Sequence, residues 1–197
     1  MPGSQSTGEC PQLFAGDQGG ARRLRVPHRL KGVERILVSS CLVGRPVRYD
    51  GAARPVAGDL FERWRAEGRL VPFCPEVSGG LPVPRPPAEI VGGDGGAVLD
   101  GTALVVTRAG ADVTAEFLRG ARLALAAARR AGARIALLKE GSPSCGSGRV
   151  HDGTFSGASV PGTGVTTALL RREGIRVFGE DDLDAVQELL IALERAD

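Results

Sequence analysis

Short apolar runs alternate along this chain with segments in which apolar residues recur every three or four positions. Short continuous runs are typical of strands buried in a sheet, and the longer periodic segments are typical of amphipathic helices. The predicted strands are 33–40, 70–74, 134–139 and 175–178. The predicted helices run from Asp59 to Gly68 and over 115–131, 165–173 and 182–195.

This order of strands and helices indicates an α/β fold. Because crossovers between parallel strands are right-handed, the four strands are expected to lie side by side and parallel. Two further segments, 88–91 and 97–106, predict a small β-hairpin with a glycine-rich tip. We therefore expect a three-layer, Rossmann-like fold with a mainly parallel central sheet, plus this hairpin.

The first 31 residues lack such periodicity and are rich in Gly, Pro, Gln, Ser and Arg. Five basic and two acidic residues give this segment a charge of +3, so the remainder carries −1 of the chain's +2. We expect a mobile or disordered tail over 1–31 and a single α/β domain over 32–197. The nearly neutral domain argues against a large RNA partner, which would need concentrated positive charge.

Hydropathy and cysteine content predict a cytoplasmic protein without a membrane partner. No apolar run reaches the roughly 18 residues of a membrane span, and the N-terminus lacks the apolar core of a signal peptide. The chain has four cysteines. Without a secretion signal, these are expected to be reduced thiols or metal ligands rather than a disulfide framework.

Three of the cysteines come just after predicted strands. Cys41, Cys74 and Cys145 each lie beside residues typical of loops, such as Gly, Pro and Ser. In open parallel sheets, ligands bind beyond the carboxyl ends of the strands, so one edge of the sheet could gather all three thiols. Cys10 lies in the N-terminal tail, where we interpret it as an incidental thiol.

The thiols leave several kinds of site open. They could be buried small apolar side chains, as free cysteines often are. A structural zinc site would need a fourth ligand, from Cys10 or His151, and a C-x-x-C pair is absent. A cluster on three thiolates would leave one iron without a protein ligand, as a catalytic site requires. A nucleophilic cysteine paired with His151 would leave Cys41 and Cys74 without a role.

A series of short motifs occurs between about residues 33 and 180. The motifs are VSSCLVG (38–44), VRYDG (47–51), CPEV (74–77), GGLP (79–82), PRPPAEI (84–90), KE (139–140), SPSCG (142–146), DGTFSG (152–157) and GVT (164–166). In this order they resemble the thiouracil desulfidase family. The tail before Lys31 lies outside the resemblance.

The resemblance implies a [4Fe–4S] cluster held by Cys41, Cys74 and Cys145. It also implies that the fourth iron binds the sulfur of a thiolated pyrimidine. The C–S bond then breaks hydrolytically, without net redox change, and gives a uracil-type product and sulfide. An iron with an open position is a suitable Lewis acid for a soft sulfur.

Glu76 and Ser142 match positions that the resemblance identifies as catalytic or substrate-contacting. Glu76, two residues past a predicted ligand, could activate water or transfer a proton, or it could simply face solvent. Ser142 could donate to a carbonyl or thiocarbonyl, or it could only form a turn. Lys139, one of two lysines in the chain, could neutralise sulfide or a phosphate, or lie at the surface.

We expect substrate contacts from Ser40, Tyr49 and Ser144. Tyr49 is the only tyrosine, and it either lines a pocket or completes the core. The expected substrate is a small thiolated base, nucleoside or nucleotide, with thiolated RNA as a less favoured form. Two alternatives stay open: a cluster-dependent lyase or sulfur transferase for another thiolated small molecule, and a zinc- or cluster-stabilised binding module.

Overall fold

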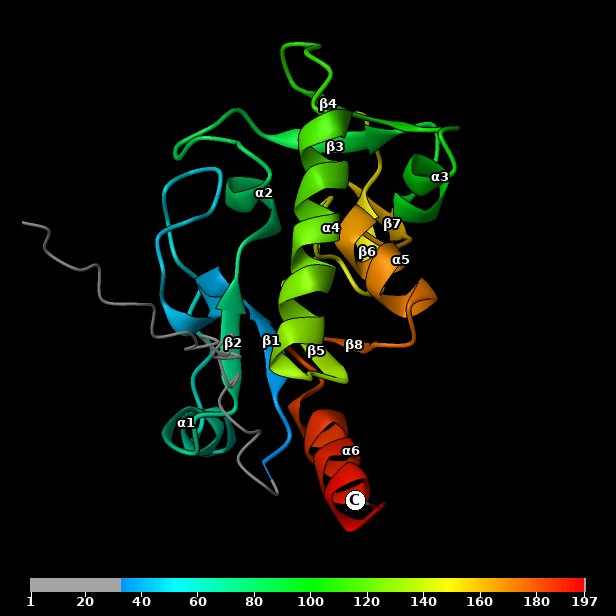
Figure 1. The fold of residues 1–197 in the computed structure, drawn as a ribbon. Helices are drawn as coiled ribbons and strands as arrows, with labels where there is room; N and C mark the ends of the chain where they lie inside the picture. Colours follow the sequence, from blue (N-terminus) through cyan, green and yellow to red (C-terminus); the bar gives the residue numbers. More distant parts are fainter. Residues whose placement is uncertain (1–32, 197) are drawn as a thin grey trace, which may run out of the picture.

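The computed structural model describes residues 33–196, so Cys10 and the predicted tail over 1–31 lie outside the described residues. A parallel sheet forms the centre of the fold (Figure 1). Its strands are the ones that the apolar runs predicted. In the order β2-β1-β5-β8, they are Leu70–Phe73, Ile36–Ser39, Ile135–Leu138 and Arg176–Gly179.

Helices cover both faces of this sheet, which gives the predicted three layers. Along β1, Leu37 packs on one face, and Ile36 and Val38 pack on the other, as the two-residue period of a strand requires. Helices α4 (Thr114–Ala131) and α5 (Val165–Arg172) cover the first face. Helices α1 (Asp59–Ala66) and α6 (Leu183–Ala196) cover the second.

A smaller antiparallel sheet lies beyond the carboxyl ends of the central strands, near the start of α4 (Figure 1). Its strands are β3 (Ala88–Val91) and β4 (Leu104–Thr107). The prediction of a strand over 97–106 was wrong over 97–103, because α3 (Gly95–Leu99) and the turn that follows it occupy those residues. The Asp94 side chain caps this helix by accepting hydrogen bonds from the backbone N–H groups of Gly96 and Ala97.

Besides α3, four short elements went unpredicted. A 3₁₀ helix, η1 (Ser40–Val43), follows β1, and α2 (Pro75–Ser78) follows β2 with Pro75 in its first turn. Strands β6 (Arg149–His151) and β7 (Ser159–Pro161) pair as a second hairpin. Strands of three residues are too short to show a periodic pattern. None of the helices within residues 33–196 is long and apolar enough to cross a membrane.

Candidate active site

The three predicted ligands lie beyond the carboxyl ends of three neighbouring strands. Cys41 lies in η1 after β1, Cys74 directly precedes α2 after β2, and Cys145 lies in the loop after β5. In the order β2-β1-β5-β8, the connection that leaves β1 leads to β2, and the connection that leaves β5 leads to β8 on the opposite side. Such a switch point opens a crevice beyond the strand ends, and this is where the thiols lie.

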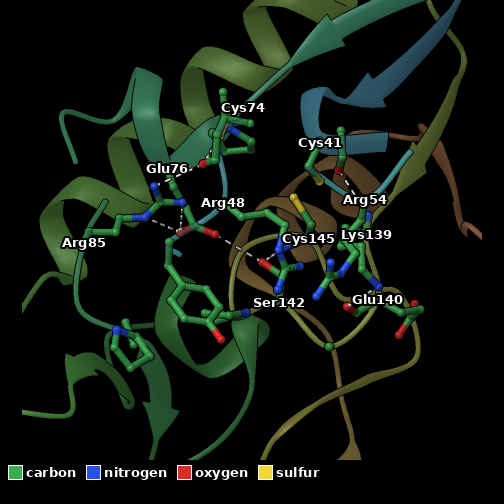
Figure 2. A pocket seen from close by; sticks show the side chains of 18 of the residues that line it. Cys41, Arg48, Arg54, Cys74, Glu76, Arg85, Lys139, Glu140, Ser142 and Cys145 are labelled. Carbon is green, nitrogen blue, oxygen red and sulfur yellow. Dashed lines mark hydrogen bonds and ion pairs between the residues drawn. The ribbon is translucent and has the colours of Figure 1, made fainter. Parts of the chain in front are cut away.

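All three cysteines line one cavity of about 470 Å³ (Figure 2). The cavity also contains most of the other residues predicted for the site. These are Glu76, Ser142, Lys139, Ser40 and Tyr49. Tyr49 is 42% exposed, so it belongs to the mouth of the cavity rather than to the core.

The thiols are free, and Cys41 and Cys145 are buried. Burial raises the pKa of the Cys41 thiol to about 11, although Arg48 and Lys139 oppose the shift. Burial also raises the pKa values of Cys74 and Cys145. The buried thiols therefore favour their protonated form. Because metal ligation requires thiolates, binding of a cationic group here would release these protons.

The cavity offers three sulfur donors, which are the ligands that an iron–sulfur cluster takes. Within residues 33–196, no three His, Cys, Asp or Glu side chains converge closely enough to hold one ion. A single zinc ion needs such a group, and His151, which lines the same cavity, is not part of one. In an iron–sulfur cluster each thiolate binds its own iron, so thiols distributed around a cavity fit that group. The donor set therefore fits a cluster with three thiolate ligands.

Glu76 extends from α2 toward Ser142 and contacts Arg85 on its other side (Figure 2). Its Oε2 atom accepts hydrogen bonds from Nε and Nη2 of Arg85, at 2.8 and 2.6 Å. Its Oε1 atom accepts from the Ser142 hydroxyl at 3.3 Å. Glu76 is thus a cavity-lining carboxylate held by a charged partner, and the solvent-facing alternative was wrong.

Ser142 forms a turn and also faces the cavity. Its Oγ accepts hydrogen bonds from the backbone N–H groups of Ser144 and Cys145, both at 3.1 Å, and so forms the turn. The same hydroxyl donates to Glu76 inside the cavity. The turn therefore fixes the position of the hydroxyl that faces the cavity.

Comparison with known proteins agrees with this geometry. The profile of the 2-thiouracil desulfurase family matches residues 36–182. The chain belongs to the 2-thiouracil desulfurase family. A Bacillus subtilis (strain 168) relative, the uncharacterized protein YbbK, is 48% identical over 151 residues, covering 77% of this chain and 99% of its own. A solved structure of the [4Fe-4S]-dependent thiouracil desulfidase TudS is 56% identical, with a TM-score of 0.72, covering 81% of this chain and 97% of its own.

In this desulfurase-family chain, Ser144 is the predicted site residue that lies outside the cavity lining. It is 1% exposed, and its hydroxyl shares a hydrogen bond of 2.9 Å with Thr166 Oγ1. Its carbonyl accepts from the Thr166 N–H, also at 2.9 Å. Gly164 permits this contact, since a Cβ there would lie 2.4 Å from the Ser144 carbonyl oxygen. The structure therefore places Ser144 against α5.

Lys139 lies at the end of β5 and is held by a residue that sequence reasoning missed. Its Nζ forms an ion pair with Glu180, which follows β8, and donates to the Glu140 carbonyl at 3.2 Å. Glu180 also accepts a hydrogen bond of 2.6 Å from the Glu140 N–H. Glu180 thus joins the ends of two adjacent strands and fixes Lys139 beside the cavity.

Glu140 also went unassigned from sequence. Its carboxylate accepts hydrogen bonds from the backbone N–H groups of Ser147, Gly148 and Arg149, and from the Ser147 hydroxyl. Burial alone would raise the pKa of Glu140, but these donors, Ser147 foremost, hold it below its usual value. The carboxylate therefore closes the loop that contains Ser142 and Cys145.

Proposed function

We propose that this protein removes sulfur from a thiolated pyrimidine by hydrolysis, using a [4Fe–4S] cluster held by Cys41, Cys74 and Cys145. Water replaces the sulfur of the C=S group by oxygen, and sulfur leaves as hydrogen sulfide, so the reaction has no net redox change. The observation that carries this proposal is the gathering of three free thiols, Glu76 and Ser142 in one cavity. Family membership and the likeness to a [4Fe-4S]-dependent thiouracil desulfidase support it.

When bound, the cluster supplies a Lewis-acidic iron that no protein thiolate occupies. Glu76 is the general base: its Oε1 atom faces the cavity and takes a proton from the attacking water. Ser142, fixed by its two backbone donors, presents a hydroxyl that can hydrogen-bond the reacting carbonyl or thiocarbonyl. The ammonium group of Lys139 lies beside the cavity and favours the departing sulfide by its charge.

Charges at the mouth support a nucleotide as the preferred form of the substrate. Arg54 and Arg108 are exposed there, and Arg48 lies 5.5 Å over the Tyr49 ring. Within the described residues, the Arg54 side chain forms no ion pair, and Arg48 Nε reaches only Asp50, at 3.4 Å. These guanidinium groups can bind a phosphate, while Tyr49 offers a ring face to the pyrimidine.

Steady-state kinetics of sulfide release on thiouracil, thiouridine and thiouridine monophosphate test this preference. We expect the lowest KM for the nucleotide, and about a tenfold increase in that KM for Arg54→Gln. The matched control is Arg45→Gln, which removes an exposed arginine outside the cavity lining. Equal KM values for base and nucleotide would contradict the preference. A thiolated oligoribonucleotide turned over faster than the nucleotide would instead make RNA the substrate.

Metal and sulfide analysis tests the cofactor. Protein purified without oxygen should contain about four irons and equal acid-labile sulfide per chain. Each of Cys41→Ser, Cys74→Ser and Cys145→Ser should lose them, and Cys10→Ser should retain them. About one zinc without sulfide would favour the binding module, which also predicts that Glu76→Gln changes nothing. Turnover of other thiolated small molecules but not thiouracil would favour the lyase or sulfur transferase.

The three free thiols also support a cytoplasmic location, because cysteines remain reduced there. Fractionation of cells that produce the protein at its natural level tests this. Recovery of the protein outside the cytoplasmic fraction would contradict it.

A further inference from the structure

Arg85 is a buried arginine whose guanidinium makes four hydrogen bonds. The residue is 9% exposed and lies in the proline-rich segment between α2 and β3. Nε and Nη2 donate to the same oxygen of Glu76, while Nη1 donates to the carbonyls of Val47 and Pro82, both at 3.1 Å. Its backbone N–H donates to the Tyr49 carbonyl at 2.8 Å. Arg85 therefore links the 47–49 loop, α2 and the segment before β3.

The two oxygens of Glu76 have different surroundings. Oε2 accepts both hydrogen bonds from Arg85. Oε1 has Ser142 as its hydrogen-bond partner among the described residues, at the longer distance of 3.3 Å. A carboxylate oxygen has two lone pairs, so Oε1 retains the capacity to accept a proton or a hydrogen bond from water. The side of Glu76 that faces Ser142 is therefore the side with free accepting capacity.

We propose that Arg85 is the positioning residue of this site: by binding Oε2 of Glu76, it fixes the carboxylate so that Oε1 faces Ser142 and the reacting water. This inference rests on the proposed function, in which Glu76 is the general base. Arg85 does not touch the reacting atoms. Its effect reaches them through Glu76.

The chemistry of the guanidinium explains why an arginine suits this task. Its planar fork donates in fixed directions, so the Nη1 bonds to Val47 and Pro82 set the orientation of the Nε and Nη2 bonds to Glu76. A lysine ammonium is a point charge on a flexible stem and could balance the charge without fixing the carboxylate plane. The prolines on both sides, Pro84 and Pro86, restrict the backbone from which Arg85 extends.

A double-mutant cycle tests the inference. The variants are Arg85→Gln, Arg85→Lys, Glu76→Gln and the double variant Arg85→Gln/Glu76→Gln, with sulfide release, iron content and the thermal midpoint measured for each. We expect Arg85→Gln to lower kcat about 100-fold with iron content retained, as for a misplaced general base. Arg85→Lys, which keeps the charge, should lower kcat about tenfold and leave KM unchanged. In the Glu76→Gln background, Arg85→Gln should change kcat by less than about threefold, because residues that act as a unit are not additive.

The matched control is Arg119→Gln. Arg119 donates to the Gly79 carbonyl at the end of α2 and, among the described residues, forms no hydrogen bond or ion pair with Glu76, so its loss should leave kcat unchanged. Chemical rescue adds a second measurement: guanidinium chloride at low millimolar concentration should raise the kcat of Arg85→Ala, and equal sodium chloride should not.

Equal kcat losses for Arg85→Gln in both backgrounds would overturn the inference and make Arg85 a structural residue. So would a wild-type kcat for Arg85→Lys together with absence of guanidinium rescue. Failure of the proposed function gives a different result: the wild-type protein would release no sulfide, or Glu76→Gln would keep its activity. If Arg85→Gln does not fold, Arg85→Lys and its combination with Glu76→Gln provide the same comparison.

Discussion

Replacement of Gly120 by alanine should damage the active site although it lies in the middle of a helix. Gly120 is buried in α4, and a Cβ there would lie 2.2 Å from the Pro75 carbonyl oxygen at the start of α2. The approach is reciprocal, since a Cβ on Gly79 would lie 2.2 Å from the Glu116 carbonyl oxygen in α4. Helices α2 and α4 therefore pack backbone against backbone, without room for side chains.

The size of the effect follows from these contacts. A carbon and a carbonyl oxygen normally approach to about 3.3 Å, so α2 would have to move by about 1 Å. Such overpacking costs about 1–3 kcal/mol, whereas alanine in place of glycine usually stabilises a helix by about 1 kcal/mol. The net loss of about 1 kcal/mol lowers the thermal midpoint by about 3 °C in a chain of this length.

The expected effect on turnover is much larger. Helix α2 begins directly after Cys74 and contains Glu76, so a shift of α2 moves a predicted ligand and the predicted general base together. A displacement of about 1 Å at catalytic groups can lower kcat about 100-fold. We therefore expect a protein that is only slightly less stable but has lost most of its activity.

Thermal unfolding, iron content and sulfide release measured on Gly120→Ala check this reasoning. The control is Gly148→Ala, because a Cβ on Gly148 meets no atom within 4 Å and its backbone N–H to Glu140 is kept. A Gly120→Ala protein that melts higher, as an ordinary helix substitution would, and turns over at the wild-type rate would refute the close packing of α2 on α4.

Two further variants test other parts of the structure. Glu140→Gln weakens the hydrogen bonds that the Glu140 carboxylate accepts and that close the Cys145 loop. It should lower the free energy of unfolding by about 2 kcal/mol in denaturant melts, and it should also lower the iron content of the protein. Its control, Glu173→Gln, removes a surface ion pair and should cost less than about 0.5 kcal/mol. Asp94→Ala removes the α3 cap and the bonds to Thr163, and should cost about 2 kcal/mol at pH 7. Burial opposes the shift, but the bonds from Thr163 hold the pKa of Asp94 below its usual value. This contribution is therefore present above the unfolded-state pKa near 4 and lost as pH falls below it, so the melting difference between Asp94→Ala and wild type should shrink there.

The sequence predicted the location of the cysteines because strand order determines it. Each thiol follows an apolar run, and all parallel strands end at the same edge of the sheet. Knowing that the strands were parallel was sufficient to expect Cys41, Cys74 and Cys145 together. The resemblance to a family then distinguished a cluster from the other uses of three thiols.

The polar contacts of the site could not be predicted in the same way. Glu180 and Lys139 are 41 residues apart, and their contact depends on the pairing of β8 with β5. Arg85 and Glu76 are nine residues apart, but their bond depends on how the proline-rich segment returns across α2. Neither pair has a sequence spacing that indicates contact. The one signal was Arg85 itself, a charged residue in a proline-rich segment of a recognised motif.

Ser142 and Ser144 show why proximity in sequence does not determine orientation. Both flank Pro143 next to a predicted ligand, and both were expected in the site. Backbone contacts decide between them. The turn at Ser142 directs its hydroxyl toward Glu76, and the close approach of Gly164 directs Ser144 toward Thr166. The loop therefore uses one serine for the cavity and the other to attach Cys145 to α5.

The Thr167 hydroxyl, which donates to the Cys145 carbonyl at 2.8 Å, completes that attachment. Chemistry at this site thus depends on α5, from which no predicted site residue comes.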